Sequence, residues 1–246
     1  YRPHNLSKKP LSETKADLVV IGGGVTGVSA SYFAAKAGAS VICIEQGHIN
    51  SEASGGNAGS LHVQLLSWDF GAKAVGDGQL QLRTLPLQME SINMWSSLQR
   101  QLNTDFEIEF TGGLMVAENS EQMKFLQEKI NAEEKVGVKT SLIDQKQIAG
   151  IVPEISDSVI AGSWCEEEGK INPLIATPIL AKEALSQGAV IEELTQVLGV
   201  SKEACGYEII TNRGKILAKK LIVAAGGWSS KIFEMLNVAI PIKGAP

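Results

Sequence analysis

The chain has 246 residues, of which 44% are hydrophobic and 20% are charged, a balance that excludes a disordered or collagen-like chain. Its 22 basic and 27 acidic side chains leave a net charge of −5, which argues against a nucleic-acid-binding protein because phosphate neutralisation needs clustered cations. It contains no apolar run of about 18 residues, so we expect no membrane span. Cys43, Cys165 and Cys205 form no C-x-x-C pair, which favours free thiols in a reducing cytoplasm over a disulfide framework or a metal site.

The first elements in chain order predict a βαβ unit. Residues 1–16 are polar, and we expect a flexible arm there. Residues 17–21 predict a buried strand, residues 25–37 a helix that Gly38 ends, and residues 40–45 a second buried strand. A strand, a helix and a strand in direct succession indicate parallel pairing through a right-handed crossover.

The middle of the chain predicts structure of another kind. After a long loop of small residues at 46–60, the pattern predicts a helix over 87–102, a hairpin of 106–110 with 114–117, a helix over 120–136 and a short helix between Asp144 and Pro153. The hairpin implies antiparallel pairing. We therefore expect a second, partly antiparallel α+β domain inserted over residues 68–162.

The last third returns to alternating strands and helices. Strands are predicted over 158–165, 190–191, 195–200, 207–211 and 215–224, and a helix over 173–187. The predicted fold class is therefore α/β, with a Rossmann-like domain made of residues 17–67 and 163–240. Residues 241–246 are expected to begin a return to the inserted domain.

The motif that carries chemistry lies between the first strand and the first helix. Residues 22–27 read Gly-Gly-Gly-Val-Thr-Gly, which fits G-x-G-x-x-G in its required context. Gly22 permits a tight turn, Gly24 lets a diphosphate approach the backbone, and Gly27 lets the helix pack on the strand. The free N–H groups at the start of the helix would bind the diphosphate.

Glu45 completes this fingerprint at the end of the second strand. A carboxylate there accepts hydrogen bonds from ribose hydroxyls and repels a 2′-phosphate, which disfavours NADP. The fingerprint alone leaves FAD and NAD open. Two further segments favour FAD, namely the Ala-Ser-Gly-Gly-Asn-Ala-Gly loop at 53–59 and the second strand-to-glycine junction, Ala-Ala-Gly-Gly-Trp-Ser, at 224–229.

Together with the Val-Val-Ile opening at residue 19 and Glu168-Gly169 ahead of Pro173, these motifs resemble the FAD-dependent D-amino-acid oxidase family. That family includes glycine oxidase, sarcosine oxidase and D-amino-acid dehydrogenase. The resemblance runs from Asp17 to the C-terminus and is loose between Trp68 and Val159. Residues 57–63 also resemble the flavin subunits of opine oxidases, which work in complexes with other chains.

The resemblance implies a set of FAD-binding residues, with the inserted domain binding substrate. The diphosphate residues are Gly22, Gly24, Val25, Thr26 and Gly27; the ribose residues are Glu45 and Gln46; those along the diphosphate and flavin are Ser54, Asn57, Ala58, Gly59 and Ser60; Val197 meets the adenine; and Ala225, Gly226 and Trp228 close the other side. Some relatives attach flavin to a histidine in the loop after the first βαβ unit. Here Gly56 and Asn57 occupy that neighbourhood, so non-covalent FAD is expected.

The resemblance implies that a small-molecule amino acid, or an N-substituted one, is oxidised to an imine by hydride transfer to flavin. Three alternatives stay open: an FAD-dependent 2-hydroxy acid or polyol phosphate dehydrogenase, an NAD-binding reductase, and a non-catalytic subunit or fragment that needs a partner. The substrate carboxylate usually needs an arginine, but Arg2, Arg83, Arg100 and Arg213 lie in no recognisable pocket motif. The catalytic residues, the electron acceptor and the oligomeric state are therefore not assigned.

The resemblance also bears on the extent of the chain. In the family, the Pro-x-x-Gly segment found here at 241–244 leads back through the substrate domain to a stretch that covers the flavin ring. We therefore expect these residues to be the N-terminal part of a longer polypeptide, or a piece that needs a complementary chain. Other subunits of an oxidase complex are further possible partners.

Overall fold

The computed structural model describes residues 5–242, and all of their side chains except those of residues 73, 75 and 77. The described residues form two compact units: those up to residue 57 together with those from residue 173 onward, and residues 58–172. The sequence placed the two borders at 67/68 and 162/163. The unit borders differ because β3 (Ser60–Leu61) pairs with β7 (Gly169–Lys170), which joins both flanking segments to the second unit. Of the expected return at 241–246, residues 243–246 lie outside the described residues.

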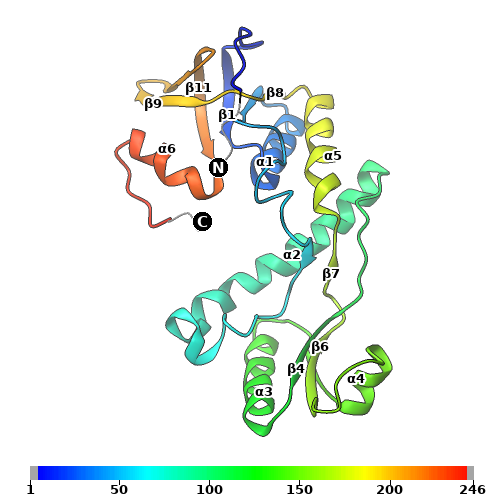
Figure 1. The fold of residues 1–246 in the computed structure, drawn as a ribbon. Helices are drawn as coiled ribbons and strands as arrows, with labels where there is room; N and C mark the ends of the chain where they lie inside the picture. The colour runs from blue at the N-terminus through cyan, green and yellow to red at the C-terminus, as the bar shows by residue number, and fades with distance from the viewer. Residues whose placement is uncertain (1–4, 243–246) are drawn as a thin grey trace. The chain divides into compact units, whose positions relative to one another are not determined.

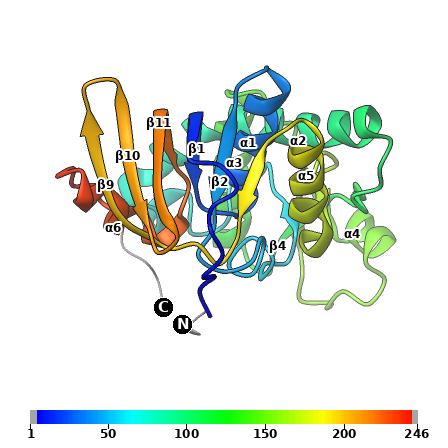
Figure 2. The same ribbon diagram turned by 90° about the horizontal axis from the view of Figure 1, so that it is seen from above.

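The first unit contains a six-stranded mixed sheet in the order β8-β2-β1-β11-β10-β9 (Figures 1 and 2). β11, β1, β2 and β8 pair in parallel, whereas β9, β10 and β11 form an antiparallel meander. The strands are β1 (Lys15–Ile21), β2 (Val41–Ile44), β8 (Val190–Glu192), β9 (Val197–Glu203), β10 (Gly206–Thr211) and β11 (Gly214–Val223). The predicted α/β class is confirmed.

Helices cover the two faces of this sheet. Alternate residues of a strand point to opposite faces, and β1 follows this rule. Val20 lies against Gly27 of α1 (Val25–Lys36), while Val19 and Ile21 belong to a core cluster with Ile232 of α6 (Ser229–Met235). α5 (Pro173–Ser186) packs beside α1, and η3 (Gly226–Trp228) leads into α6. Residues 18–21 of β1 are buried between helices on both faces, and this part of the strand is an uninterrupted apolar run.

The predicted flexible arm is bound to this unit over its described part. Lys15 and Ala16 already belong to β1. The N–H of Ser7 donates to the Leu194 carbonyl at 2.9 Å, and Leu11 packs against the core cluster. The polar composition of the arm predicts a solvated tail. Its contacts could not be foreseen from the local sequence, because the partners lie far along the chain.

The second unit has a three-stranded antiparallel sheet in the order β4-β6-β5. Besides β3 and β7, its elements are η1 (Gly71–Lys73), η2 (Val75–Gly78), α2 (Gln79–Leu102), β4 (Gly113–Ala117), α3 (Ser120–Glu134), β5 (Ser141–Asp144), α4 (Gln145–Ile151) and β6 (Ala161–Cys165). Asn119 and Asp144 cap α3 and α4 by accepting N–H groups, and Asp144 forms a capping box with Gln147. Within residues 5–242, no helix is long and apolar enough to cross a membrane.

Two expectations for this unit were wrong. α2 begins at Gln79 rather than at residue 87, and it continues through Pro86. Residues 106–110 do not form a hairpin with 114–117, because β4 pairs with β6 instead. Phe106 is fully buried, but Glu107 has a left-handed φ of 54°, which breaks the extended run.

A buried polar cluster ties this unit together. Lys129 and Glu133 of α3 are 0% exposed and form an ion pair of 2.8 Å. Glu133 accepts the N–H of Leu65 at 2.7 Å, and Lys129 donates to Gln64 Oε1 at 3.1 Å. Glu168 accepts the N–H groups of residues 63 and 64 at 2.7 and 2.8 Å. Together the two carboxylates hold the segment 63–65 by its backbone.

Candidate functional site

The glycine-rich turn after β1 is shaped by close backbone contacts. Gly22 has φ of 118°, and a Cβ there would lie 2.3 Å from the carbonyl oxygen of Ala224, which directly follows the neighbouring strand β11. A Cβ at Gly27 would lie 1.9 Å from the Gly22 carbonyl oxygen. Both positions therefore exclude any side chain. The sheet and the first helix approach each other as the fingerprint requires.

Gly24 has a different role at the N-terminus of α1. Its φ and ψ of −79° and 178° are ordinary extended values, and it supplies no side-chain cap. The first turn of α1 contains no acidic residue. Ser54 Oγ accepts the N–H of Val25 at 2.9 Å, and a Cβ on Gly24 would lie 2.8 Å from that oxygen. A side chain at Gly24 would therefore press on the Ser54 hydroxyl and crowd the space over the positive end of the helix, where anions bind.

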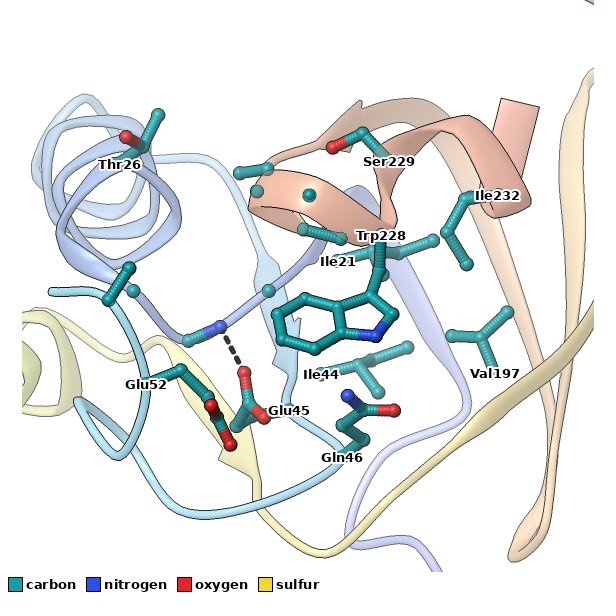
Figure 3. A pocket seen from close by; sticks show the side chains of 18 of the residues that line it. Ile21, Thr26, Ile44, Glu45, Gln46, Glu52, Val197, Trp228, Ser229 and Ile232 are labelled. Carbon is teal, nitrogen blue, oxygen red and sulfur yellow. Dashed lines mark hydrogen bonds between the residues drawn. The ribbon is translucent and has the colours of Figure 1, made fainter. Parts of the chain in front are cut away.

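Glu45, directly after β2, is bound to the same turn. Its Oε2 accepts the N–H of Gly23 at 2.6 Å (Figure 3), and its Oε1 accepts the N–H of Gly47 at 2.7 Å. Each carboxylate oxygen has a second lone pair, so both can still accept a hydroxyl. Glu45 therefore shapes the loop and offers acceptors to a ligand at once.

These groups lie on one cavity of about 780 Å³ in the first unit, a size typical of small-molecule sites. Figure 3 shows the Trp228 indole in this cavity, near Ile44, Gln46 and Val197, with Glu45 to its left and Thr26 further away at the upper left. One end is thus apolar and aromatic. The other is the glycine turn with its N–H groups.

Ten of the sixteen predicted cofactor residues line this cavity: Gly22, Gly24, Thr26, Glu45, Gln46, Ser54, Val197, Ala225, Gly226 and Trp228. Val25 and Gly27 lie in the same turn of chain but do not line it. Asn57 is at the border of the first unit, and Ala58, Gly59 and Ser60 belong to the second unit.

Sequence reasoning missed other lining residues. From the loop after β2 come Asn50, Ser51, Glu52 and Ala53; from the segment after β8 come Thr195 and Gln196; and from α6 come Lys231, Ile232 and Met235. The spacing of 231, 232 and 235 on a helix directly after the second glycine junction is the one signal that could have indicated the α6 residues.

Other reactive side chains are committed to structural contacts. Arg213, which sequence reasoning considered for a substrate carboxylate, pairs with Glu192 at 2.5 Å, and its side chain is 8% exposed. Burial raises the pKa of Cys43 to about 12 and that of Cys165 to about 11, so both thiols stay neutral. No group of His, Cys, Asp and Glu suited to a metal ion occurs within residues 5–242.

The cavity fits the adenosine diphosphate part of a dinucleotide. Its lining combines the glycine turn at the N-terminus of α1, the Glu45 carboxylate, and apolar and indole surfaces. The sequence profile of the family described as FAD dependent oxidoreductase (DAO) matches residues 17–245.

The chain belongs to the DAO family of FAD-dependent oxidoreductases. Among curated relatives, glycine oxidase from Geobacillus kaustophilus is 23% identical over 236 residues, which cover 93% of this chain and 60% of the relative. One subunit of the anaerobic glycerol-3-phosphate dehydrogenase of Escherichia coli is 29% identical over 248 aligned positions, covering 96% of this chain and 43% of that protein. The DAO chain described here therefore spans about two-fifths to three-fifths of these relatives.

Solved structures agree on the fold. Glycine oxidase from Geobacillus kaustophilus superposes with a TM-score of 0.81 at 20% identity, covering 93% of this chain and 60% of the other. At that identity the likeness concerns the fold alone. L-proline dehydrogenase from P. horikoshii has a TM-score of 0.79 at 28% identity, covering 92% of this chain and 56% of the other.

Proposed function

We propose that this DAO-family chain carries the FAD-binding part of an enzyme that oxidises the C–N bond of an amino acid, or of an N-substituted amino acid, to an imine. The observation that carries the proposal is the single cavity on which Gly24, Glu45 and Trp228 meet. Relatives named glycine oxidase and dimethylglycine dehydrogenase, and a structural neighbour named L-proline dehydrogenase, support an amine substrate.

In this proposal the residues of the first unit hold non-covalent FAD. The N–H of Thr26 binds the diphosphate, together with the N–H of Val25, which exchanges its bond to Ser54 Oγ for a phosphate oxygen. Glu45 accepts the ribose hydroxyls, and the adenine lies between Val197 and Trp228. Bound FAD supplies a two-electron acceptor for the hydride of the substrate carbon. In this proposal the chain's own contribution is orientation of the cofactor.

A second candidate is the oxidation of a polyol phosphate. Its support is the 29% identity with the glycerol-3-phosphate dehydrogenase subunit, together with a structural neighbour named L-alpha-glycerophosphate oxidase. A third is a cofactor-binding subunit without turnover of its own. All three share FAD binding in the same cavity and differ in the substrate.

We also propose that turnover needs protein beyond these 246 residues, either a continuation of the chain or a complementary chain. The support is that the chain matches 60% of glycine oxidase and 43% of the dehydrogenase subunit. Association with further subunits of an oxidase complex, and a cytoplasmic location, are proposals that follow from the resemblance and from the free cysteines.

The test begins with the purified chain. Its visible spectrum should show flavin bands, and denaturation should release FAD intact. A panel of glycine, sarcosine, proline, D-alanine, lactate and glycerol 3-phosphate then follows, with an artificial electron acceptor and with the complementary part of a relative supplied. Reduction of the bound flavin by amino acids alone supports the first candidate, and its reduction by glycerol 3-phosphate alone supports the second. A colourless chain that binds no FAD contradicts all three.

A further inference from the structure

The turn between β10 and β11 binds the N-terminal arm. Arg213 Nε donates to the Lys9 carbonyl and Nη2 donates to the Pro10 carbonyl, each at 2.6 Å. Asn212 Nδ2 donates to the Ser7 carbonyl at 2.9 Å. Two adjacent side chains thus hold the backbone of the arm at three carbonyls.

The same guanidinium reaches the end of β8 with its remaining nitrogen. Arg213 Nη1 donates to Glu192 Oε2 at 2.5 Å and to Thr195 Oγ1 at 2.9 Å. Ser12 of the arm binds the other oxygen of this carboxylate through its N–H at 2.8 Å and through its hydroxyl. The side chains of Arg213 and Glu192 are only 8% and 6% exposed, so water screens this pair little.

The residues held in this way border the cofactor cavity. The N–H of Thr195 donates to the Glu45 carbonyl at 2.8 Å, and the N–H of Glu45 donates to the Glu192 carbonyl at 3.0 Å. Asn212 Oδ1 accepts the N–H of Gln196 at 2.7 Å. Thr195 and Gln196 line the cavity beside Glu45. Hydrogen bonds therefore run without a break from the arm to the loop that carries Glu45.

We propose that Arg213 is a positioning residue, and that residues 7–12 are a strap, which together hold the ribose and base end of the nucleotide pocket in its binding geometry. This rests on the proposed binding of FAD. A guanidinium is suited to the task because its fixed fork can donate to four acceptors at once, whereas a lysine ammonium cannot span them. Without Arg213, the carboxylate of Glu192 would be buried without its cation.

The geometry also limits where the strap acts. Its contacts reach Glu45, Thr195 and Gln196, whereas the diphosphate end is formed by the glycine turn and the N-terminus of α1, which the strap does not touch. Loss of the strap should therefore weaken the binding of adenosine and the binding of ADP by the same factor. The gain in affinity that the diphosphate adds should stay the same.

The experiment compares the full chain with a chain that starts at Glu13, and with Arg213→Lys and Arg213→Gln. Lys219→Met is the matched control, because it removes the exposed 2.6 Å pair with Asp17 on the same sheet without touching the strap. Dissociation constants of adenosine, ADP and FAD are measured by calorimetry, at a temperature where circular dichroism shows each variant folded. Coupling between sites is typically about 5–150-fold, and we expect about tenfold weaker binding of all three probes.

Two further results decide the matter. A synthetic peptide of residues 1–12 should restore the affinity of the shortened chain, which general destabilisation would not allow. The proposal would be overturned if the shortened chain and Arg213→Lys bound all three probes as tightly as the unaltered chain. It would also be overturned if these variants lost affinity for ADP and FAD but not for adenosine. If Arg213 variants do not fold, the milder Ser12→Ala replaces them, with a smaller loss expected and unchanged affinity counting against the strap. Failure of the unaltered chain to bind FAD or ADP would contradict the proposed function instead.

Discussion

At the scale of single residues, the glycines of one turn have separate tasks. At Gly22 and Gly27 neighbouring backbone atoms occupy the space that a Cβ would need. At Gly24 a Cβ would meet only the side chain of Ser54, and both residues line the cavity. A substitution at the first two positions disturbs the fold. A substitution at the third disturbs the ligand.

Gly24→Val should accordingly give a folded chain that binds no FAD. Its backbone conformation suits any residue, but the added side chain fills the diphosphate space beside Ser54. Gly22→Ala should instead lower the free energy of unfolding, by about 1–3 kcal/mol for the strained conformation alone. Urea titration and flavin binding distinguish the two, with the core change Val20→Ile as a control that keeps binding. A yellow Gly24→Val chain of normal affinity would show that the cofactor lies elsewhere.

Glu45→Ala should weaken FAD binding by about 10- to 150-fold, since a hydrogen bond to a charged group contributes about 1.5–3 kcal/mol. The change also removes the acceptor of the Gly23 and Gly47 N–H groups, so part of the loss comes from the loop. Glu45→Gln, which keeps one acceptor oxygen, should lose less. Flavin fluorescence titration measures both, with the exposed Glu203→Ala as control. Equal affinity in all four chains would exclude the ribose role.

At the scale of elements, the buried pair on α3 stabilises the second unit. Lys129→Met would leave the Glu133 carboxylate buried without its cation, which typically costs about 3–5 kcal/mol. Adding Glu133→Gln should restore much of this loss, because the amide oxygen can still accept the N–H of Leu65. Chemical unfolding of the single and double variants measures the difference. A double variant less stable than the single one would refute this account.

The strap makes the stability of the first unit depend on pH through Glu192. Burial works against its charged form, but the hydrogen bonds from Ser12 and the charge of Arg213 outweigh burial and hold its pKa below the ordinary value. The folded pKa is thus lower than the unfolded one, about 4.3 for an ordinary glutamate. The stabilisation is complete above that pH and is lost as the pH falls through the folded pKa.

We therefore expect the midpoint of urea unfolding to fall more steeply below about pH 5 in the natural chain than in Glu192→Gln. The difference between the two chains is the measurement, because other carboxylates titrate in both. Parallel pH profiles would show that Glu192 contributes nothing.

The elements also show what a sequence can reveal. Gly22, Gly27 and Glu45 could be predicted because the fingerprint is local, with its spacing set by one βαβ unit. Thr195 and Arg213 could not, because their importance comes from hydrogen bonds between segments far apart in the chain. The start of α2 was missed because a proline such as Pro86 usually lies near a helix start, yet here it lies within the helix.

At the scale of the whole molecule, the two compact units should respond differently to ligand. In the proposed function FAD binds the folded first unit, and it should then slow hydrogen exchange around residues 21–28, 44–54 and 194–197 by mass action. Amides of α3 in the second unit should exchange at the same rate with and without FAD. Hydrogen–deuterium exchange with mass spectrometry tests this, and equal protection of α3 would show that the units are coupled.

The pairing of β1 with β11 sets the order in which the molecule can be completed during synthesis. Lys15 lies opposite Leu217, so a ribosome adding about 5–20 residues per second releases β11 some 10–40 s after β1. The second unit, continuous from 58 to 172, is finished earlier. Throughout that interval the apolar edge of β1 has no neighbour on one side, which makes it a natural target for chaperones. The cavity that we propose for the cofactor is complete only after Trp228 has emerged.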